Sequence, residues 1–216
     1  PSPGHILGSA SIELRTGEGG SHRIVYSGCL GRPGSPLLRD AEPLPGEVDT
    51  LIIGGPFAHA RHRMFSDGQQ HLATVINETV ARGGQIIVPA SSIGPVHEFV
   101  RTVQMRRCLP DTRHTVLLLS FQEAGSVGHQ LEIGDGEVMI ETVPVEVRAR
   151  IERLPGFSGH ADGEEIRGWV RSLQGPIRRA FVVHGDDLSV AMMVTILREE
   201  GGRDVIVPRE GESFPF

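Results

Sequence analysis

The sequence predicts a layered α/β protein in which short buried strands alternate with helices. Apolar runs such as residues 51–53, 116–119 and 180–183 have the length of buried strands. Segments such as residues 189–199 place apolar side chains at helical spacing and end at a pair of glycines. Alternation of these two patterns along one chain is typical of α/β folds.

The first 60 residues predict a hairpin followed by a third strand. Residues 12–14 and 22–27 flank the stretch Thr16-Gly17-Glu18-Gly19-Gly20, whose glycines suit a hairpin turn. Residues 49–53 fit a short buried strand. The proline-rich stretch at 32–46 predicts an irregular connection between them.

The middle of the chain predicts a helix, a strand and several shorter elements. Four apolar residues recur at helical spacing: Leu72, Val75, Ile76 and Val80. Gly83-Gly84 ends this helix, and a strand at 85–88 follows. We expect a second helix at 95–107, a buried strand at 115–120, and a pair of short strands within 138–150 around Pro144.

The last 60 residues predict two further pairs of helix and strand. Asp162 stands where a helix cap is needed, and Glu164 and Glu165 place negative charge in the first turn, where the helix dipole favours it. The buried face of this helix consists of Ile166, Trp169, Val170 and Leu173. A strand at 180–183, a helix at 189–199 and a last strand at 204–208 complete the order.

Composition limits the class of protein. The chain has 216 residues, of which 38% are hydrophobic, enough for one sizeable core or two small ones. Its apolar runs are far shorter than the roughly 20 residues that span a bilayer, so we expect no membrane insertion and a cytoplasmic location. The two cysteines, Cys29 and Cys108, could form one disulfide, but reduced thiols are favoured.

Charge argues against a surface built mainly to attract nucleic acid. The formal net charge is -6, whereas basic patches supply most non-specific affinity for nucleic acids. The possibility of a local basic patch on the surface stays open. All 21 basic residues are arginines, which we attribute first to codon bias in a GC-rich genome and second to bidentate contacts with phosphate.

Two histidine motifs lie near the carboxyl end of the chain. Ser158-Gly159-His160-Ala161-Asp162 precedes a predicted helix, and Phe181-Val182-Val183-His184-Gly185-Asp186 ends a predicted strand. This pair resembles the last two motifs of the metallo-β-lactamase/β-CASP nucleases, the family of the pre-mRNA 3′-end cleavage factor and its bacterial relatives. Residues 3–10, 24–32, 49–57 and 117–131 are similar to further blocks of that family, in the same order.

The resemblance implies a fold and a domain order. It implies part of a metallo-β-lactamase αββα sandwich with an inserted, shortened β-CASP α/β domain. The first domain would occupy residues 1–56, the insertion residues 57–156, and the return to the first domain residues 157–216.

The resemblance also implies a zinc site and RNA as the substrate. Two zinc ions can clamp a phosphodiester and lower the pKa of a bound water to about 7. By resemblance, His5 binds the first ion, His184 the second, and Cys29 takes the bridging position. His160 would protonate the leaving oxygen, and Ser158 would contact the substrate. Without this context, a lone histidine is more often a hydrogen-bonded loop residue than a ligand.

The sequence departs from the family pattern at three points. The His-x-His-x-Asp-His motif, which supplies the other metal ligands, is absent, so we expect the N-terminal metal-binding half to lie upstream of Pro1. Cys29 stands where the family has aspartate. Gly54 stands where the family has the glutamate that orients His160.

Three classes of function therefore stay open. The first is a zinc-dependent RNA hydrolase whose site is completed by upstream residues or by another subunit. The second is a catalytically inactive relative that binds RNA or scaffolds an active paralogue. The third is a zinc hydrolase of small substrates. Because strands near Ile24 and Leu51 would leave an apolar face or edge uncovered, we also expect marginal stability or pairing, for instance as a homodimer.

Overall fold

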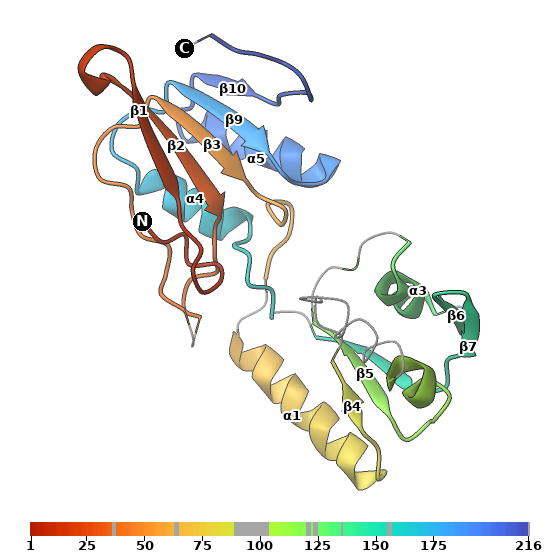
Figure 1. Ribbon diagram of the computed structural model, residues 1–216. Coiled ribbons are helices and arrows are strands. Elements are labelled where there is room, and N and C mark those ends of the chain that lie inside the picture. Colours follow the sequence, from red (N-terminus) through yellow and green to blue (C-terminus); the bar gives the residue numbers. More distant parts are fainter. Residues whose placement is uncertain are drawn as a thin grey trace. The chain divides into compact units, whose positions relative to one another are not determined.

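The protein consists of two compact units, seen in a computed structural model (Figure 1). The structure describes residues 1–35, 38–62, 65–88, 104–119, 122, 125–134, 136–154 and 157–215. The first unit comprises Pro1–Arg61 and Gly159–Phe216, and the second comprises His62–Ser158. The assignment of residues 1–56 and 157–216 to a metallo-β-lactamase domain, and of 57–156 to a β-CASP insertion, stays a prediction.

The first unit is built on a sheet of five strands in the order β1-β2-β3-β9-β10 (Figure 1). β1 (Ile12–Thr16) pairs antiparallel with β2 (His22–Cys29). β3 (Thr50–Gly54), β9 (Arg179–Val183) and β10 (Asp204–Ile206) continue the sheet in parallel. The carboxyl ends of β2, β3 and β9 therefore lie side by side at one edge.

The connections in this unit follow the sequence signals. A short 3-10 turn, η1 (Glu18–Gly20), joins β1 to β2, so the hairpin prediction is confirmed. Helix α4 (Gly163–Arg171) begins with a capping box, in which the Asp162 carboxylate accepts the Glu165 backbone N–H at 3.0 Å and the Glu165 carboxylate accepts the Asp162 N–H at 2.9 Å. Helix α5 (Asp187–Glu199) connects β9 to β10.

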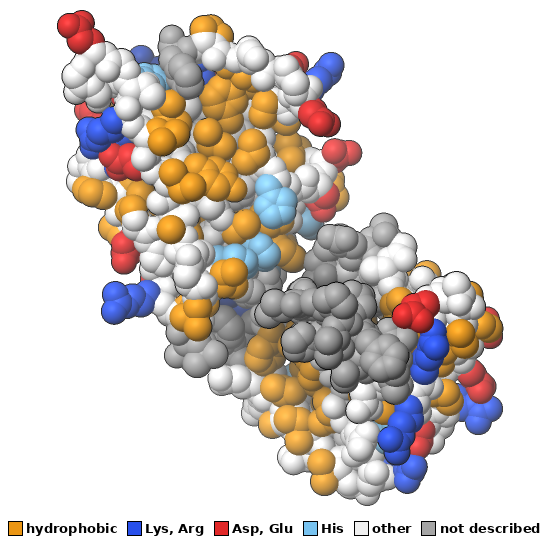
Figure 2. All heavy atoms as spheres, in the orientation of Figure 1, with side chains coloured by type: hydrophobic (Ala, Val, Ile, Leu, Met, Phe, Trp, Pro, Cys, Tyr) orange, Lys and Arg blue, Asp and Glu red, His pale blue; other side chains and the backbone are white. Residues whose placement is uncertain are grey.

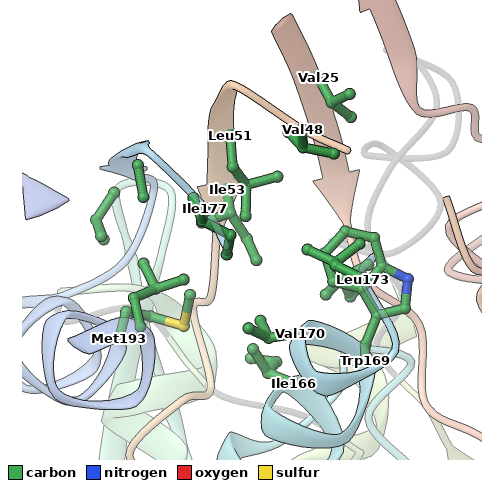
Figure 3. Close-up of a cluster of buried hydrophobic side chains, with 14 of the residues drawn as sticks. Val25, Val48, Leu51, Ile53, Ile166, Trp169, Val170, Leu173, Ile177 and Met193 are labelled. Carbon is green, nitrogen blue, oxygen red and sulfur yellow. The ribbon is translucent and has the colours of Figure 1, made fainter. Parts of the chain in front are cut away.

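Helices α4 and α5 cover one face of the sheet and form the main core with it (Figure 3). Because side chains alternate along a strand, every second residue of β2, β3 and β9 enters this core. Its members from the strands and the two helices include Val25, Leu51, Ile53, Ile166, Val170 and Met193. Trp169 closes its edge, and its indole N–H donates to the Glu42 carbonyl at 3.2 Å.

The opposite face of the sheet is also apolar, and part of it is exposed. Leu14 keeps 57% of its surface exposed, and Figure 2 shows hydrophobic side chains gathered over the first unit. A pocket of about 350 Å³ on this face is bordered by the C-terminal segment, where Phe214 lies 5.0 Å from Phe181 between ring centroids. Leu51 was expected near an uncovered face, but it is fully buried against the helices, because it points to the other side of β3.

The second unit contains a parallel sheet of three short strands in the order β4-β5-β8. These are β4 (Ile86–Ile87), β5 (Thr115–Leu118) and β8 (Arg150–Arg153). Helix α1 (Phe65–Ala81) precedes β4, and Val75 of α1 packs on Leu117 of β5. The predicted helix, its stop at Gly83-Gly84 and the two strands that follow it are confirmed.

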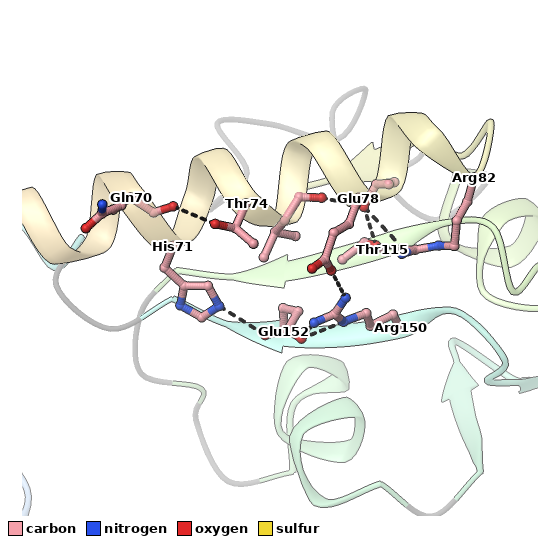
Figure 4. A network of polar contacts seen from close by, with 10 residues as sticks. Gln70, His71, Thr74, Glu78, Arg82, Thr115, Arg150 and Glu152 are labelled. Atoms are coloured by element: carbon pink, nitrogen blue, oxygen red, sulfur yellow. Dashed lines mark hydrogen bonds and ion pairs between the residues drawn. The ribbon is translucent and has the colours of Figure 1, made fainter.

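Polar contacts join α1 to this sheet (Figure 4). The Thr79 and Thr115 hydroxyls are buried and lie 2.7 Å apart. Arg150 of β8 pairs with Glu78 of α1 and with Glu152, and Glu152 also lies 3.4 Å from a ring nitrogen of His71. These ion pairs are partly exposed, so each adds little to stability.

The rest of the second unit differs from the sequence prediction. β6 (Glu137–Ile140) and β7 (Val143–Glu146) form a hairpin, but Pro144 lies within β7 and not between the strands. The turn is instead made at Glu141, which adopts a φ of 59° without being glycine. Helix α3 (Val127–Ile133) was not predicted. Of the helix expected at 95–107, residues 95–103 lie outside the described residues.

The helices were compared with the length and hydropathy of membrane-spanning segments. Within the described ranges, no helix combines the length and the apolar character needed to cross a bilayer.

The central strand β3 should dominate the stability of the first unit. We expect Leu51→Ala to lower the free energy of unfolding by about 2–5 kcal/mol, because it opens a cavity between the sheet and its helices. Ile12→Ala serves as the control, since Ile12 is 54% exposed and should cost far less. Urea denaturation followed by tryptophan fluorescence measures both; equal losses would contradict the assigned core.

The ion pair between Glu13 and Arg23 should make stability depend on pH. The hydrogen bond from Arg23, at 2.7 Å, lowers the pKa of Glu13. In the unfolded chain the pKa of a glutamate is about 4.3, and in the folded protein that of Glu13 is lower. The ion pair therefore stabilises the fold fully at pH values above about 4.3. This stabilisation is lost as the pH falls through the pKa of the folded state. Wild type should therefore exceed Glu13→Gln in stability at pH 7, and the difference should shrink below about pH 4. A difference that is constant with pH would contradict this.

Candidate metal centre

Four of the predicted site residues gather at the carboxyl edge of the first unit's sheet. Cys29 is the last residue of β2, and His184 directly follows β9. One donor atom each from His5, Cys29 and His160 lies within 4.8 Å of the others. His184 contacts the same cysteine, with its Nδ1 3.6 Å from Cys29 Sγ. Histidines (pale blue) are visible at the surface of the first unit in Figure 2.

Backbone hydrogen bonds hold the three loops of this cluster together. The Gly31 N–H donates to the Pro3 carbonyl at 2.7 Å, which ties the loop after β2 to the loop that carries His5. The Arg32 N–H donates to the Gly159 carbonyl at 3.2 Å, and the Ala161 N–H donates to the Leu30 carbonyl at 2.9 Å. The segment that carries His160 is thereby fixed on both sides.

Gly31 permits this close approach. A Cβ at position 31 would lie 1.9 Å from the backbone oxygen of Gly4, which is far below any permitted contact. Only glycine lets the His5 loop lie directly on the loop after β2.

The histidine rings lie against one another and against an aromatic side chain. The ring centroids of His5 and His160 are 4.0 Å apart, and Phe57 stacks on His160 at 5.2 Å. His5 Nδ1 lies 3.0 Å from the Gly159 carbonyl oxygen. Because a carbonyl only accepts hydrogen bonds, Nδ1 is the donor in this contact. Phe57 was not identified from the sequence, which offers no local signal that an aromatic in this loop meets His160.

Cys29 is a free, half-buried thiol, and Cys108 is also free. Burial raises the pKa of the Cys29 thiol, because a thiolate loses hydration there. Without a cation nearby, Cys29 is therefore a neutral thiol at pH 7.

His184 has a backbone conformation that residues other than glycine seldom adopt. Its φ of 57° is left-handed, and its carbonyl accepts the Gly55 N–H at 3.2 Å. A Cβ at Gly54 would lie 3.2 Å from both His184 Cβ and the Val183 carbonyl oxygen. A longer side chain at position 54 would therefore force His184 to shift.

The contact of Ser158 with the substrate stays a prediction. Ser158 is buried and is the last residue of the second unit. His59, which the sequence left without a site role, lies 2.7 Å from the Ser189 hydroxyl through Nδ1.

Comparisons with known proteins agree with the motifs that surround this cluster. The family described as "Zn-dependent metallo-hydrolase RNA specificity domain" matches residues 144–208, which include His160 and His184. The transcription termination factor FttA of Pyrococcus abyssi is 19% identical over 95% of this chain and 46% of its own length. Ribonuclease TTHA0252 of Thermus thermophilus is 21% identical over 98% of this chain and 68% of its own length.

The chain is similar to β-CASP RNA-processing nucleases of the metallo-β-lactamase fold, and the family model that it matches covers residues 144–208. An RNase J-like protein of Methanocaldococcus jannaschii is a further relative, 23% identical over 88% of this chain and 65% of its own length. The chain spans about half the length of the termination factors that it matches. A mixed α/β fold with a parallel sheet is what the family resemblance led us to expect.

The donor types of this cluster, histidine nitrogen and cysteine sulfur, fit a metal ion of the zinc type. Within the part of the chain that the structure describes, a single group of His, Cys, Asp or Glu side chains is close enough to share an ion, and it has three members. Cys29 offers one sulfur where a bridging carboxylate offers two oxygens. The resemblance implies two zinc ions for the family, and the departures predict fewer or none in this chain; the number stays a prediction.

The contact at Gly31 should be essential to the cluster. We expect Gly31→Ala to separate the His5 loop from the loop after β2 and to cost about 1–3 kcal/mol or more through overpacking. Gly168→Ala is the matched control, because position 168 lies in α4, is exposed and has no atom within 4 Å of the added Cβ. Its stability should stay equal or rise by up to about 1 kcal/mol. Thermal unfolding of both variants measures this; similar behaviour would contradict the close approach.

Proposed function

We propose that this chain is a metal-dependent RNA hydrolase that cleaves phosphodiester bonds at the candidate metal centre. One observation supports it most directly. Side chains from positions 5, 29, 160 and 184, which the family resemblance assigns to one site, come together at one sheet edge. Two of these four lie within the region matched by an RNA specificity domain. We propose RNA as the partner and the cytoplasm as the place of action.

The proposed chemistry assigns each side chain a separate task. A bound zinc ion supplies Lewis acidity toward a phosphate oxygen. His160, whose ring lies against those of Phe57 and His5, is assigned the transfer of a proton to the leaving oxygen. His5, oriented through the Gly159 carbonyl, presents Nε2 as a ligand.

A second candidate is a catalytically inactive relative that binds RNA or scaffolds an active paralogue. Two observations favour it. No carboxylate stands at position 54, where the family has the glutamate that supports His160, and the space there is limited by His184. Cys29 replaces the bridging aspartate of the family and cannot hold two ions in the same way.

Cleavage and binding of a labelled single-stranded RNA separate the two candidates. If the chain hydrolyses RNA, chelator should stop cleavage, and His160→Ala should lower the rate by about 10²- to 10⁴-fold through loss of proton transfer. His71→Ala, in the second unit, should leave the rate unchanged. If the chain is an inactive relative, cleavage should be absent, whereas RNA binding should persist with chelator and weaken steeply with salt. Neither cleavage nor binding would contradict both candidates.

A further inference from the structure

We propose that His59 is a specificity-determining residue, which accepts a hydrogen bond from a ribose 2′-hydroxyl and thereby makes this chain prefer RNA to DNA. The inference rests on the proposed function, because it requires a bound single-stranded nucleic acid. It concerns the sugar that is bound, and it assigns no new role to the side chains of the candidate metal centre. His59 belongs to a separate group with Pro56, Asp186 and Ser189.

The loop that carries His59 leaves the carboxyl end of β3 and is fixed on α5. The Ser189 hydroxyl, on the first turn of α5, donates to the Pro56 carbonyl at 2.8 Å. Phe57 of the same loop stacks on His160, with ring centroids 5.2 Å apart. Because two residues of chain span at most about 7 Å, His59 lies close to this stacked pair. A nucleic-acid strand bound at His160 can therefore contact His59 with a neighbouring nucleotide.

The Ser189 hydroxyl determines which ring nitrogen of His59 donates. The Nδ1 atom of His59 lies 2.7 Å from Ser189 Oγ. A hydroxyl has a single hydrogen, and Ser189 gives it to the Pro56 carbonyl, which can only accept. Ser189 Oγ therefore accepts from His59, so Nδ1 is the donor in this contact. In the neutral ring, Nε2 is then a hydrogen-bond acceptor.

The Nε2 atom of His59 is available to a ligand. The side chain keeps 36% of its surface exposed, whereas Ser189, which holds the other ring nitrogen, is fully buried. Among the residues that the structure describes, none forms a hydrogen bond with Nε2. The ring is thus anchored at one nitrogen and leaves the other for a donor that approaches from solvent.

The charge around His59 favours a hydroxyl donor over a phosphate. The Asp186 carboxylate lies 3.7 Å from His59 Nδ1, and the adjacent Asp187 is exposed. These negative charges repel phosphate, and an acceptor nitrogen has no hydrogen to give to a phosphate oxygen. A ribose 2′-hydroxyl is a donor that every ribonucleotide carries and that DNA lacks. An acceptor at position 59 therefore selects for RNA.

Three labelled strands of one sequence test the proposal: single-stranded RNA, its 2′-fluoro form and DNA. The 2′-fluoro form lacks the hydroxyl hydrogen but keeps an RNA-like sugar conformation, so it isolates the donor. Affinity is measured by fluorescence anisotropy at about pH 8, where an ordinary histidine is neutral. All proteins carry His160→Ala, which should slow hydrolysis by at least about 100-fold and keep the RNA intact. We expect RNA to bind about 3- to 10-fold more tightly than either other strand, the effect of one hydrogen bond.

His59→Ala should remove this preference, because it deletes the acceptor. Its affinity for RNA should fall about 3- to 10-fold, while its affinities for 2′-fluoro RNA and DNA stay unchanged. Ser189→Ala tests the orientation of the ring: Nδ1 loses its acceptor, so either ring nitrogen can carry the proton and the preference should shrink. His71→Ala, in the second unit, is the control and should keep the preference. Circular dichroism checks that each variant is folded.

Two results would overturn the inference and leave RNA binding in place. The first is equal affinity for RNA and 2′-fluoro RNA, which would assign any preference over DNA to sugar conformation. The second is a preference for RNA that persists in a folded His59→Ala variant. Binding of none of the three strands would overturn the inference together with the proposed function, so the two failures are told apart.

Discussion

The parallel pairing of β2, β3 and β9 is the constraint on which the candidate centre depends. Parallel strands end at a common edge, so Cys29, Gly54 and His184 become neighbours although they lie far apart in the sequence. Ligand sites in open α/β sheets generally form beyond the carboxyl ends of the strands. The core beneath, built from α4 and α5, fixes the strands that carry these positions.

Two loops outside the sheet supply the remaining side chains of the candidate centre. His5 and His160 lie outside the sheet, and backbone hydrogen bonds from Gly31, Arg32 and Ala161 bring both to Cys29. Such bonds tolerate no added Cβ at Gly31, which explains why a glycine follows the strand so closely. The geometry of the cluster therefore depends in part on these backbone contacts.

Sequence patterns predicted the elements whose signals are local. Helix α4 was predicted from its cap at Asp162 and from the apolar face that includes Val170, both of which lie in one short segment. The first hairpin was predicted from the glycine-rich stretch before His22. The turn at Glu141 was missed because it uses a left-handed residue that is not glycine, so Pro144 was wrongly taken as the break. The members of the cluster came from motif resemblance, but their mutual distances depend on strand order, which no local pattern contains.

The departures at Cys29 and Gly54 have a common physical consequence. An aspartate can bridge two ions through two oxygens, whereas one thiolate binds a single ion strongly, so cysteine at position 29 favours a one-metal site. A glutamate at the position of Gly54 would support a histidine as a proton carrier, and glycine leaves that support out. Both substitutions thus act in one direction, away from the carboxylate-supported centre of the family.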